Sequence, residues 1–297
     1  MTDTVDVLCV GHASYDLIFS VAQHPGPDEK ILANSLLSCG GGPAANAAVC
    51  ISKLGLRSAF AGYLGHDLYG DKHLQELNDH QVNTQLTIRG ISPTPLSTIL
   101  VKPDGKRCLI NYKGDTQALP AQALNTFNLQ AKAILFDGHE PLISLPIADQ
   151  ARRNNIPTVL DAGSVHEGTL ALMDRVDYLV CSEKFACQYA SNEDQALSQL
   201  AKLAPVVVIT LGERGLIWQR GHQQGSLAAF PITAIDTTGA GDAFHGAFAA
   251  ALTLGLEWQS LLRYASAAGA LCCMKMGARL GLPDKIEHNR FLTLFSE

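Results

Sequence analysis

The feature that most constrains the fold of this chain is a repeated alternation of short apolar runs with longer segments of helical periodicity. The runs end in Gly or Asp, and typical pairs are AILFDG followed by PLISLPIADQARRNN, and DYLVCS followed by EKFACQYA. Repeated strand, helix, strand units of this kind build a mostly parallel sheet covered by helices. The sequence therefore predicts an α/β fold.

The ends of these apolar runs predict where a ligand binds. In open parallel sheets the ligand crevice lies outside the C-terminal ends of the strands. Five apolar runs reach that edge at Gly11, Gly62, Asp137, Asp161 and Gly212. We expect functional side chains close to these positions.

Two segments interrupt the alternation, at about 13–38 and 94–114. The second contains LSTILVKPDGKRCLINY, in which PDGK is typical of a hairpin turn between two strands. We expect the two segments to form a small β-sheet lid inserted into the α/β body. Because no fixed-period repeat, low-complexity tract or Pro/Ser linker is present, residues 1–297 are predicted to form one domain.

Composition excludes several classes of function. The 297 residues are 47% hydrophobic, which is enough for a sizeable core. Only 17% are charged and the formal net charge is -6, with no local Lys/Arg run, so nucleic acid is not an expected partner. The N-terminal stretch MTDTVDVLCVGHASYD carries acids and only a short apolar run, which predicts neither a secretory signal nor a membrane span, and hence a cytoplasmic protein.

The cysteines predict buried thiols rather than a metal site. They occupy positions 9, 39, 50, 108, 181, 187, 272 and 273, without a Cys-x-x-Cys pair, and most lie in apolar runs such as VDVLCV. The histidines show no ligand spacing either, so a zinc site is not expected.

The segment DTTGAGDAF, residues 236–244, predicts an anion site with a carboxylate beside it. Apolar residues at helical spacing follow it, so a buried helix is expected to begin near Gly241 or Asp242. Gly239 and Gly241 allow the first amides, from Ala240 to Asp242, to converge on an anion. The Asp242 carboxylate then suits a general base that takes a proton from an incoming hydroxyl. The alternative is that Asp242 only caps the helix.

DTTGAGDAF also resembles a signature of the ribokinase, or PfkB, family of sugar kinases. A second signature lies at GGGPAANAAVCISKLG, residues 40–55, and GYLGHDLYG, TLGERG and GARLGLP follow in the family's order. The resemblance covers essentially the whole chain. It implies a ribokinase-like three-layer α/β/α fold with a small inserted lid, and a kinase that transfers the γ-phosphate of ATP to a hydroxyl of a small sugar with Mg²⁺.

The resemblance implies roles for individual positions. Asp242 is implied as the catalytic base, beside the anion-binding residues Gly239, Ala240 and Gly241. Sugar-binding roles are implied for Asp16, Gly41, Gly42, Asn46, Lys30, Arg107, Asn111 and His12. Nucleotide-binding roles are implied for Thr210, Gly212, Gly215, Ser266 and Gly277, and roles at cations for Glu183, Asp236 and Thr238.

Some of these residues have a plainer interpretation. Asp16 can be a solvated acid at a strand end, and Asn46 can simply pack in the first turns of a helix. Lys30 can be a solvated surface lysine, since lysines are mostly exposed. His245, which follows the signature, is expected to be a satisfied packing residue.

The metal site departs from the family pattern. The family's Asn-x-x-Glu element should fall at SEKF, where Ser182 replaces Asn and Phe185 replaces Glu, with Glu183 nearby. Magnesium bound chiefly through nucleotide oxygens and waters is compatible with this change. The resemblance also implies a monovalent cation such as K⁺ near Asp236, Thr238 and the Gly277 loop.

The acceptor sugar is expected to be a ketohexose or a fructose-like derivative. CGGGPAANAAV, LINY and GARLGLPD are most similar to the sulfofructose kinase and fructokinase-like branch. Lys30 and Asn111 match positions that hold an anionic group at the far end of such a sugar. The arginine expected after the DG of ILFDGHE is absent, and His139 or Glu140 stands near that place, with Arg107 as the expected substitute. A neutral ketohexose, a sugar phosphate and a sulfonated sugar stay open.

Other functions compete with a sugar kinase. A nucleoside kinase of the same fold would need a lid rich in aromatics, and the lid offers Tyr15, Phe19 and Tyr112. A sugar-binding sensor without catalysis is suggested by the altered SEKF element, whereas the intact GAGD favours an enzyme. GHASYD after the first strand lacks the glycines of a dinucleotide loop, which disfavours a dehydrogenase, and an ordinary P-loop is absent.

A homodimer formed through the lid sheets is expected from the resemblance. The apolar alternation of LSTILV fits such an interface, although a strand buried against its own body would show the same pattern.

Overall fold

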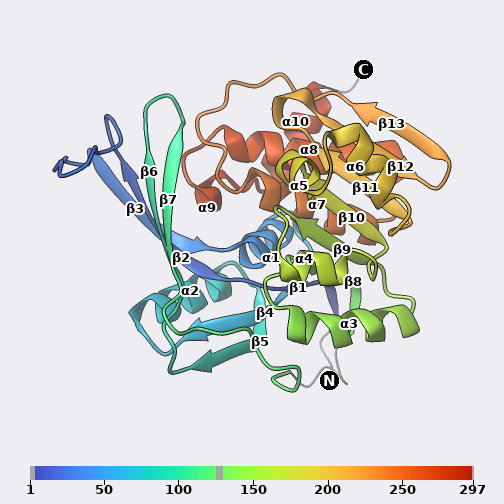
Figure 1. Cartoon of the computed structure of the whole chain (residues 1–297), viewed down its shortest axis with the longest axis horizontal. Coiled ribbons are helices and arrows are strands. Elements are labelled where there is room, and N and C mark those ends of the chain that lie inside the picture. The colour runs from blue at the N-terminus through green and yellow to red at the C-terminus, as the bar shows by residue number, and fades with distance from the viewer. Residues whose placement is uncertain (1–3, 125–129, 296–297) are drawn as a thin grey trace.

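A nine-stranded sheet forms the centre of the computed structural model, which describes residues 4–124 and 130–295 (Figure 1). Its order is β13-β12-β11-β10-β9-β8-β1-β4-β5, and all pairs are parallel except those of the β11-β12-β13 edge. The strands are β1 (Val5–Val10), β4 (Ser58–Gly65), β5 (Asn83–Gly90), β8 (Ala131–Phe136), β9 (Thr158–Ala162), β10 (Tyr178–Ser182), β11 (Val206–Thr210), β12 (Leu216–Arg220) and β13 (Gln223–Leu227).

Helices cover both faces of this sheet, which confirms the three-layer fold. One layer contains α1 (Pro43–Lys53), α2 (Leu68–Asp79), α7 (Ala240–Thr253) and α8 (Trp258–Cys273). The other contains α3 (Pro141–Arg153), α4 (Glu167–Leu172), α5 (Glu183–Tyr189) and α6 (Glu193–Leu200). The short elements are η1 (Gly212–Arg214), α9 (Ala278–Gly281) and the terminal α10 (Lys285–Leu294).

The interior strand β1, which lies between β8 and β4, is continuously apolar from Val7 to Val10 because both of its faces are buried. Val7 and Cys9 pack into the core on the α1, α7 and α8 side, whereas Leu8 and Val10 pack into the core beneath α3 to α6. A parallel strand buried on both faces has no solvent side on which a polar residue would alternate.

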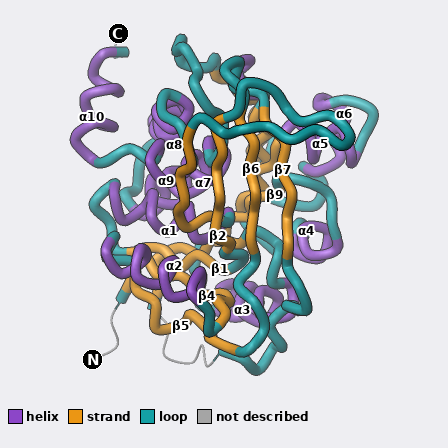
Figure 2. Tube along the Cα trace, turned by 90° about the vertical axis from the view of Figure 1, so that its left-hand side faces the viewer, coloured by secondary structure: helices purple, strands orange, loops and turns teal. Residues whose placement is uncertain are grey.

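A second sheet of four strands forms the lid, which projects from the body (Figures 1 and 2). Its order is β3-β2-β6-β7, with bounds β2 (Ser14–Ser20), β3 (Ser35–Gly41), β6 (Leu96–Val101) and β7 (Arg107–Tyr112). The PDGK hairpin is confirmed, since β6 and β7 pair antiparallel around it and Gly105 has φ 75°. β3 continues to Gly41, so the first glycines of the GGGPAAN signature lie on a lid strand rather than in a loop.

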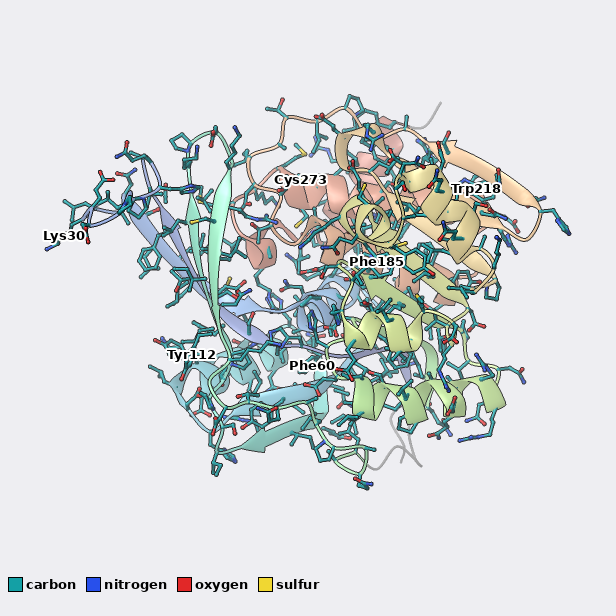
Figure 3. The ribbon with its side chains drawn as sticks, in the orientation of Figure 1. Lys30, Phe60, Tyr112, Phe185, Trp218 and Cys273 are labelled. Carbon is teal, nitrogen blue, oxygen red and sulfur yellow. The ribbon has the colours of Figure 1, made fainter. Side chains whose placement is uncertain are left out.

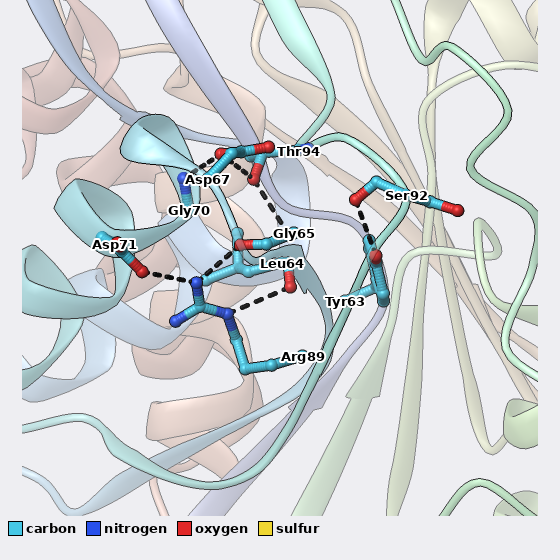
Figure 4. Close-up of polar contacts among 9 residues, drawn as sticks. All are labelled: Tyr63, Leu64, Gly65, Asp67, Gly70, Asp71, Arg89, Ser92 and Thr94. Atoms are coloured by element: carbon cyan, nitrogen blue, oxygen red, sulfur yellow. Dashed lines mark hydrogen bonds and ion pairs between the residues drawn. The ribbon is translucent and has the colours of Figure 1, made fainter.

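A polar network at the base of the lid fixes the second inserted segment to the body (Figure 4). Asp67 caps α2 through Gly70 N (2.8 Å) and accepts from both Thr94 N (2.7 Å) and Thr94 Oγ1 (2.8 Å). Arg89 donates to Leu64 O (3.1 Å) and pairs with Asp71 (2.6 Å). Thr94 lies two residues before the start of β6, so this network determines where the lid leaves the body.

Most cysteines are buried, as expected, and all are free. Cys9, Cys39, Cys50, Cys181 and Cys272 are buried, Cys108 and Cys273 are half-buried, and Cys187 on α5 is exposed. None of the helices in the described residues is long and apolar enough to cross a membrane.

We predict that Asp67→Ala destabilises the protein by about 2–3 kcal/mol, because it removes the cap of α2 and both bonds to Thr94. Asp67→Asn is the matched control. Asn caps a helix as well as Asp does, but its amide nitrogen cannot accept from Thr94 N, so we expect about half of that loss. Urea unfolding measures both variants. Equal stability of Asp67→Ala and the wild type would contradict the role assigned to this network.

Candidate active site

The cleft begins where the strand order reverses. The chain passes from β1 to β4 and β5 on one side, then returns to β8 on the other side, so the C-terminal ends of β1 and β8 flank a crevice. The Asp137 carboxylate, just after β8, accepts from His12 N (2.7 Å), Ala44 N (3.1 Å) and His139 N (2.9 Å). Asp137 therefore joins the ends of two strands to the first turn of α1. Its strand-end position was noted from the sequence, but its role in building the site was not predicted.

A cleft of about 280 Å³ lies between this edge of the sheet and the lid. It brings together six of the residues implied at the sugar or in catalysis, together with Thr238: His12, Asp16, Gly42, Asn46, Asn111 and Asp242. The cleft is also lined by Ser14, Ser97 and Lys113, which the sequence reasoning did not select. Tyr112 and His139 line it too; they were noted from the sequence only as a lid aromatic and as the residue near the missing arginine.

Asp242 faces this cleft from the first turn of α7 and does not cap the helix. The N-cap is Gly239, in the left-handed region at φ 77°, and α7 begins at Ala240, slightly earlier than expected. The Asp242 Oδ2 atom accepts from Asn46 Nδ2 at 2.6 Å. Burial raises the pKa of Asp242, and the Asn46 hydrogen bond acts in the opposite direction.

One atom of the Asn46 side-chain amide lacks a hydrogen-bond partner among the described residues. Its Oδ1 is buried and has no hydrogen-bond partner among the described residues, while its Nδ2 is occupied by Asp242. A buried acceptor without a partner is costly. The observed role of Asn46 is to orient Asp242 from α1.

The anion cradle at the start of α7 has two open amides. Ala240 N donates to Thr237 O at 3.3 Å, whereas Gly241 N and Asp242 N have no acceptor among the described residues. A Cβ built at Gly241 would meet nothing within 4 Å, so this side of the turn is open. Two amides, rather than the expected three, are therefore available to an anion at this helix N-terminus.

Asp16 lies on the opposite wall, on β2. Its side chain is buried, and Oδ1 accepts from Ser14 Oγ at 2.9 Å. Burial raises the pKa of Asp16, with the Ser14 hydrogen bond opposing it. A Cβ at Gly41 would lie 2.2 Å from Asp16 Oδ2, and Gly42 has φ 92°, so both positions require glycine for this wall to form.

Imidazole rings gather at one end of the cleft. The His12 and His139 rings lie 5.3 Å apart, and His139 stacks on His166 at 4.7 Å. Burial, followed by the nearby His139 and Lys113, lowers the pKa of His12 to about 3. His12 is therefore neutral and can both donate to and accept from a hydroxyl.

Lys30 and Arg107 do not lie where the anionic end of a sugar was expected. Lys30 is exposed in the loop between β2 and β3, at the outer tip of the lid (Figure 3), and does not line the cleft. Arg107 opens β7, on the lid face that turns toward the body, and its Nη1 donates to Thr238 Oγ1 at 2.7 Å. Arg107 therefore reaches the α7 end of the cleft, beside Asp242, instead of replacing the missing arginine near His139.

The Asp236 carboxylate accepts three hydrogen bonds from the chain. Its Oδ1 accepts from Thr238 N (2.9 Å) and Thr238 Oγ1 (2.7 Å), and its Oδ2 accepts from Gly277 N (2.8 Å). The Arg107 guanidinium already lies 3.8 Å from Oδ1. These contacts shape the loop that leads into α7, and Oδ2 keeps an acceptor site beyond its bond to Gly277 N.

The SEKF element likewise shows no metal-binding arrangement. Ser182 caps α5 by accepting from Phe185 N at 3.1 Å, and the Glu183 carboxylate pairs with Arg214 at 2.9 Å. Within the described ranges, no group of three or more His, Cys, Asp or Glu residues is placed to hold a metal ion. Ser182 serves as the cap of α5, and Phe185 packs in the core.

The expected nucleotide residues lie toward the β11 side of the same sheet edge. Thr210 ends β11, and Gly212 and Gly215 flank η1 with φ 60° and 87°. A Cβ at Gly212 would meet nothing within 4 Å, whereas one at Gly215 would lie 2.0 Å from Leu227 O. Gly215 therefore serves packing against β13, and Gly212 faces open space. Ser266 is half-buried on α8.

His245 is a satisfied buried residue, as expected. Its Nδ1 lies 2.6 Å from Gly241 O and its Nε2 lies 3.1 Å from Val180 O, which ties α7 to β10. Asp161 Oδ2 lies 3.3 Å from the same Nδ1. Burial raises the pKa of Asp161 to about 7, and the charge of His245 opposes this rise.

Comparison with known proteins identifies the family. Residues 5–285 match the model of the pfkB family carbohydrate kinases. The chain belongs to this family. Its members are phosphotransferases with an alcohol acceptor, so the dehydrogenase alternative is excluded.

Similar PfkB proteins extend over nearly the whole chain. The chain is 28% identical to the ribokinase of Bacillus subtilis, covering 97% of this chain and 99% of that one. It is 27% identical to probable fructokinase-3 of Arabidopsis thaliana, covering 86% and 83%. Among solved structures, a putative ribokinase from Agrobacterium tumefaciens has a TM-score of 0.90 at 27% identity and covers 99% of each chain. Arabidopsis thaliana ribokinase complexed with ribose and ATP has a TM-score of 0.83 at 26% identity, covering 99% of this chain and 100% of that one.

We predict that kcat has an acid limb above the ordinary Asp pKa of about 3.9, because the base acts when deprotonated and burial raises the pKa of Asp242. Activity is lost as the pH falls through that limb. Asn46→Ala removes a hydrogen bond that lowers this pKa, so its limb should lie at higher pH. Measuring kcat from pH 4 to 9 at saturating acceptor tests this. A limb at the same pH in both proteins would contradict the assignment.

Proposed function

We propose that this PfkB kinase transfers the γ-phosphate of ATP to a hydroxyl of a small sugar, with a ketohexose or a fructose-like derivative as the acceptor. The observation that carries the proposal is the position of Asp242. It faces the cleft next to the two open amides of α7, held by Asn46 and opposite the Asp16 wall. A carboxylate beside an anion site and a hydroxyl-binding wall suits phosphoryl transfer.

The transfer step uses these groups in sequence. The Asp242 carboxylate takes the proton of the acceptor hydroxyl, while Asn46 holds Oδ2 and so orients the group. The hydroxyl oxygen forms a bond to the γ-phosphorus, the bond from that phosphorus to the bridging β-phosphate oxygen breaks, and ADP leaves. The amides of Gly241 and Asp242 stabilise the charge that develops on the transferred group.

Arg107 supplies a positive charge from the lid. Its guanidinium lies against Thr238 at the α7 end of the cleft, which is where the transferred phosphoryl group would sit. We assign to it the stabilisation of the phosphoryl oxygens when the lid closes over the sugar. Because the arginine belongs to the lid, closure and charge stabilisation are linked, which limits transfer to water.

The opposite end of the cleft supports a polyhydroxylated acceptor. His12 and His139 line it together with Asn111, and all three side chains exchange hydrogen bonds with hydroxyls. Lys113 also lines it, and no described carboxylate forms an ion pair with its ammonium group, so an anionic substituent such as a sulfonate fits there as well. Lys113 and His139 would then take the role that was expected of Lys30.

Nucleotide and metal enter this proposal together. Gly212 and Thr210 face the β11 side of the sheet edge, where the ATP base and ribose would lie, with Ser266 on α8 beside them. Because the described carboxylates form no metal cluster, we propose that Mg²⁺ is held through nucleotide oxygens and water. A bound magnesium ion supplies charge neutralisation on the phosphates.

The outer face of the lid supports a homodimer. Leu36 on β3 and Ile110 on β7 are 58% and 65% exposed, and they point away from the lid core of Ile18, Ile99 and Val101. Exposed apolar residues gathered on one sheet face mark interaction surfaces. We propose that two lids pair through this face and that the enzyme works in the cytoplasm.

An ADP-release assay with ATP, Mg²⁺ and a panel of acceptors tests the function. The panel holds fructose, ribose, fructose phosphates, sulfofructose, neutral polyols and nucleosides. We expect turnover on a ketohexose-like acceptor, and a loss of about 10²–10⁴-fold in Asp242→Asn, which keeps the fold but not the base. Turnover on nucleosides alone would establish the nucleoside kinase alternative. No turnover on any acceptor, or full activity of Asp242→Asn, would overturn the proposal.

We also predict that Arg107→Gln lowers kcat at least about tenfold, with little change in the KM of the sugar, because it removes a charge that acts on the transferred group. Lys106→Gln, at the neighbouring exposed lysine, is the control and should leave kcat unchanged. Steady-state kinetics with the best acceptor of the panel decides. A rise in KM with unchanged kcat would place Arg107 at the sugar instead.

A further inference from the structure

A buried ionic cluster lies behind the sugar-binding wall and does not line the cleft. At its centre is Arg279 on α9, with 3% of its side chain exposed. Its Nε lies 3.2 Å from Gly40 O and 3.3 Å from Glu76 Oε1, and its Nη2 lies 3.2 Å from His73 Nε2. The cluster joins α9 near the C-terminus to α2 and to the lid strand β3.

The peptide at Gly40 is held on both sides by this cluster. Gly40 N donates to Glu76 Oε2 at 2.6 Å, and Gly40 O accepts from Arg279 Nε. A Cβ at Gly40 would lie 2.4 Å from His73 Cδ2 and 2.8 Å from Arg279 Nη2. The next residue, Gly41, packs directly against the carboxylate of Asp16. The cluster therefore determines where the Asp16 wall stands.

The charges of the cluster are one arginine and one glutamate. Burial, with the nearby Arg279, keeps the pKa of His73 well below its ordinary range, so its ring is neutral. A guanidinium only donates, so His73 Nε2 accepts from it. Arg279 Nη1 is buried with no partner among the described residues. An apolar cluster would avoid this unsatisfied donor, and buried ion pairs that are poor stabilisers are retained in some proteins because they fix a specific arrangement.

Residues 277–279 also contact the loop of residues 236–242, which leads into α7 and carries Asp242. Gly277, two residues before Arg279, donates to Asp236 Oδ2 at 2.8 Å, and Asp236 holds the loop that leads into α7. A Cβ at Gly277 would lie 2.9 Å from Leu37 Cδ2 and 3.3 Å from Ile18 Cδ1. Residues 277–279 therefore contact the lid core, the lid strand β3 and the loop at Asp236.

We propose that Arg279 is a positioning residue that couples β3, the lid strand that carries Gly40, to the loop of residues 236–242 at the start of α7. Through Gly40 it sets the place of Asp16, and through the Gly277 amide its segment sets the start of α7. Binding of a sugar at Asp16 thereby affects the position of the loop that carries Asp242. This inference rests on the proposed function.

The charge of Arg279 adds an effect that simple packing would not have. Burial raises the pKa of Asp16, and Arg279 opposes that rise; the other titratable groups that face Asp16 are Asp242 and Cys39, while hydroxyls of Ser14 and Ser97 bond to it. Loss of the Arg279 charge therefore shifts the acid limb of kcat/KM for the sugar to higher pH.

The test compares Arg279→Met and Arg279→Lys with Arg290→Met, an exposed arginine on α10, as the matched control. For Arg279→Met we expect kcat/KM for the sugar to fall at least about tenfold, as for a lost hydrogen bond to a charged group, with the acid limb moved upward. Arg279→Lys keeps the positive charge but loses the planar guanidinium with its several donors. We therefore expect this variant to keep the wild-type acid limb but to recover only part of kcat/KM. Arg290→Met should match the wild type.

Hydrogen exchange separates this inference from the proposed function. In ligand-free Arg279→Met, the hydrogen-bonded amide of Gly40 and those of Asp236, Thr238 and Ala240 should all exchange at least about tenfold faster than in the wild type, because the tie between the two segments is lost. This readout needs no turnover, so a failed acceptor panel leaves it decisive. Should Arg279→Met not fold, the Glu76→Gln/Arg279→Met double variant, which removes both charges, takes its place. Unchanged exchange, or unchanged kcat/KM and acid limb, would overturn the coupling.

Discussion

The site depends on how three buried carboxylates, Asp16, Asp137 and Asp161, and the half-buried Asp242 are kept in one small volume. Asp137 is compensated by three backbone amides, Asp161 by His245, Asp242 by Asn46, and Asp16 by hydroxyls and the charge of Arg279. Each partner comes from a different part of the chain, so compensation of these charges also fixes the geometry of the cleft. The burial that raises the pKa of Asp242 also makes it a stronger base for a hydroxyl proton.

Much of this arrangement was readable from the sequence. Continuous apolar runs predicted strands buried on both faces, and the PDGK turn predicted the lid hairpin. Sugar-binding roles were implied for Gly41 and Gly42, and a side chain at these positions would clash with the Asp16 carboxylate and the His12 carbonyl, respectively. Strands and turns could be predicted from the sequence because strand periodicity and turn chemistry depend on residues that are close together in the chain.

The remainder depends on contacts between distant residues. Asp137 was noted as a strand end, but its three amide partners are set by the reversal of strand order between β1 and β8. Arg107 was expected near the far end of the sugar, yet the register of β7 against β6 carries it to Thr238. Lys30 lies at the tip of a long loop whose path no periodicity predicts. Arg279 lies in the GARLGLP motif, but nothing in that motif predicts its contact with His73, which is more than 200 positions away in the sequence.

The proposed mechanism depends on Asp242 as the base that receives the proton of the acceptor hydroxyl. A crystal structure with the acceptor and a non-hydrolysable ATP analogue tests this directly. We expect the reacting hydroxyl oxygen within about 2.6–3.2 Å of the Asp242 carboxylate, with a γ-phosphate oxygen at the amides of Gly241 and Asp242. An acceptor bound to Asp16 with no hydroxyl near Asp242, or a γ-phosphate away from the start of α7, would contradict the account.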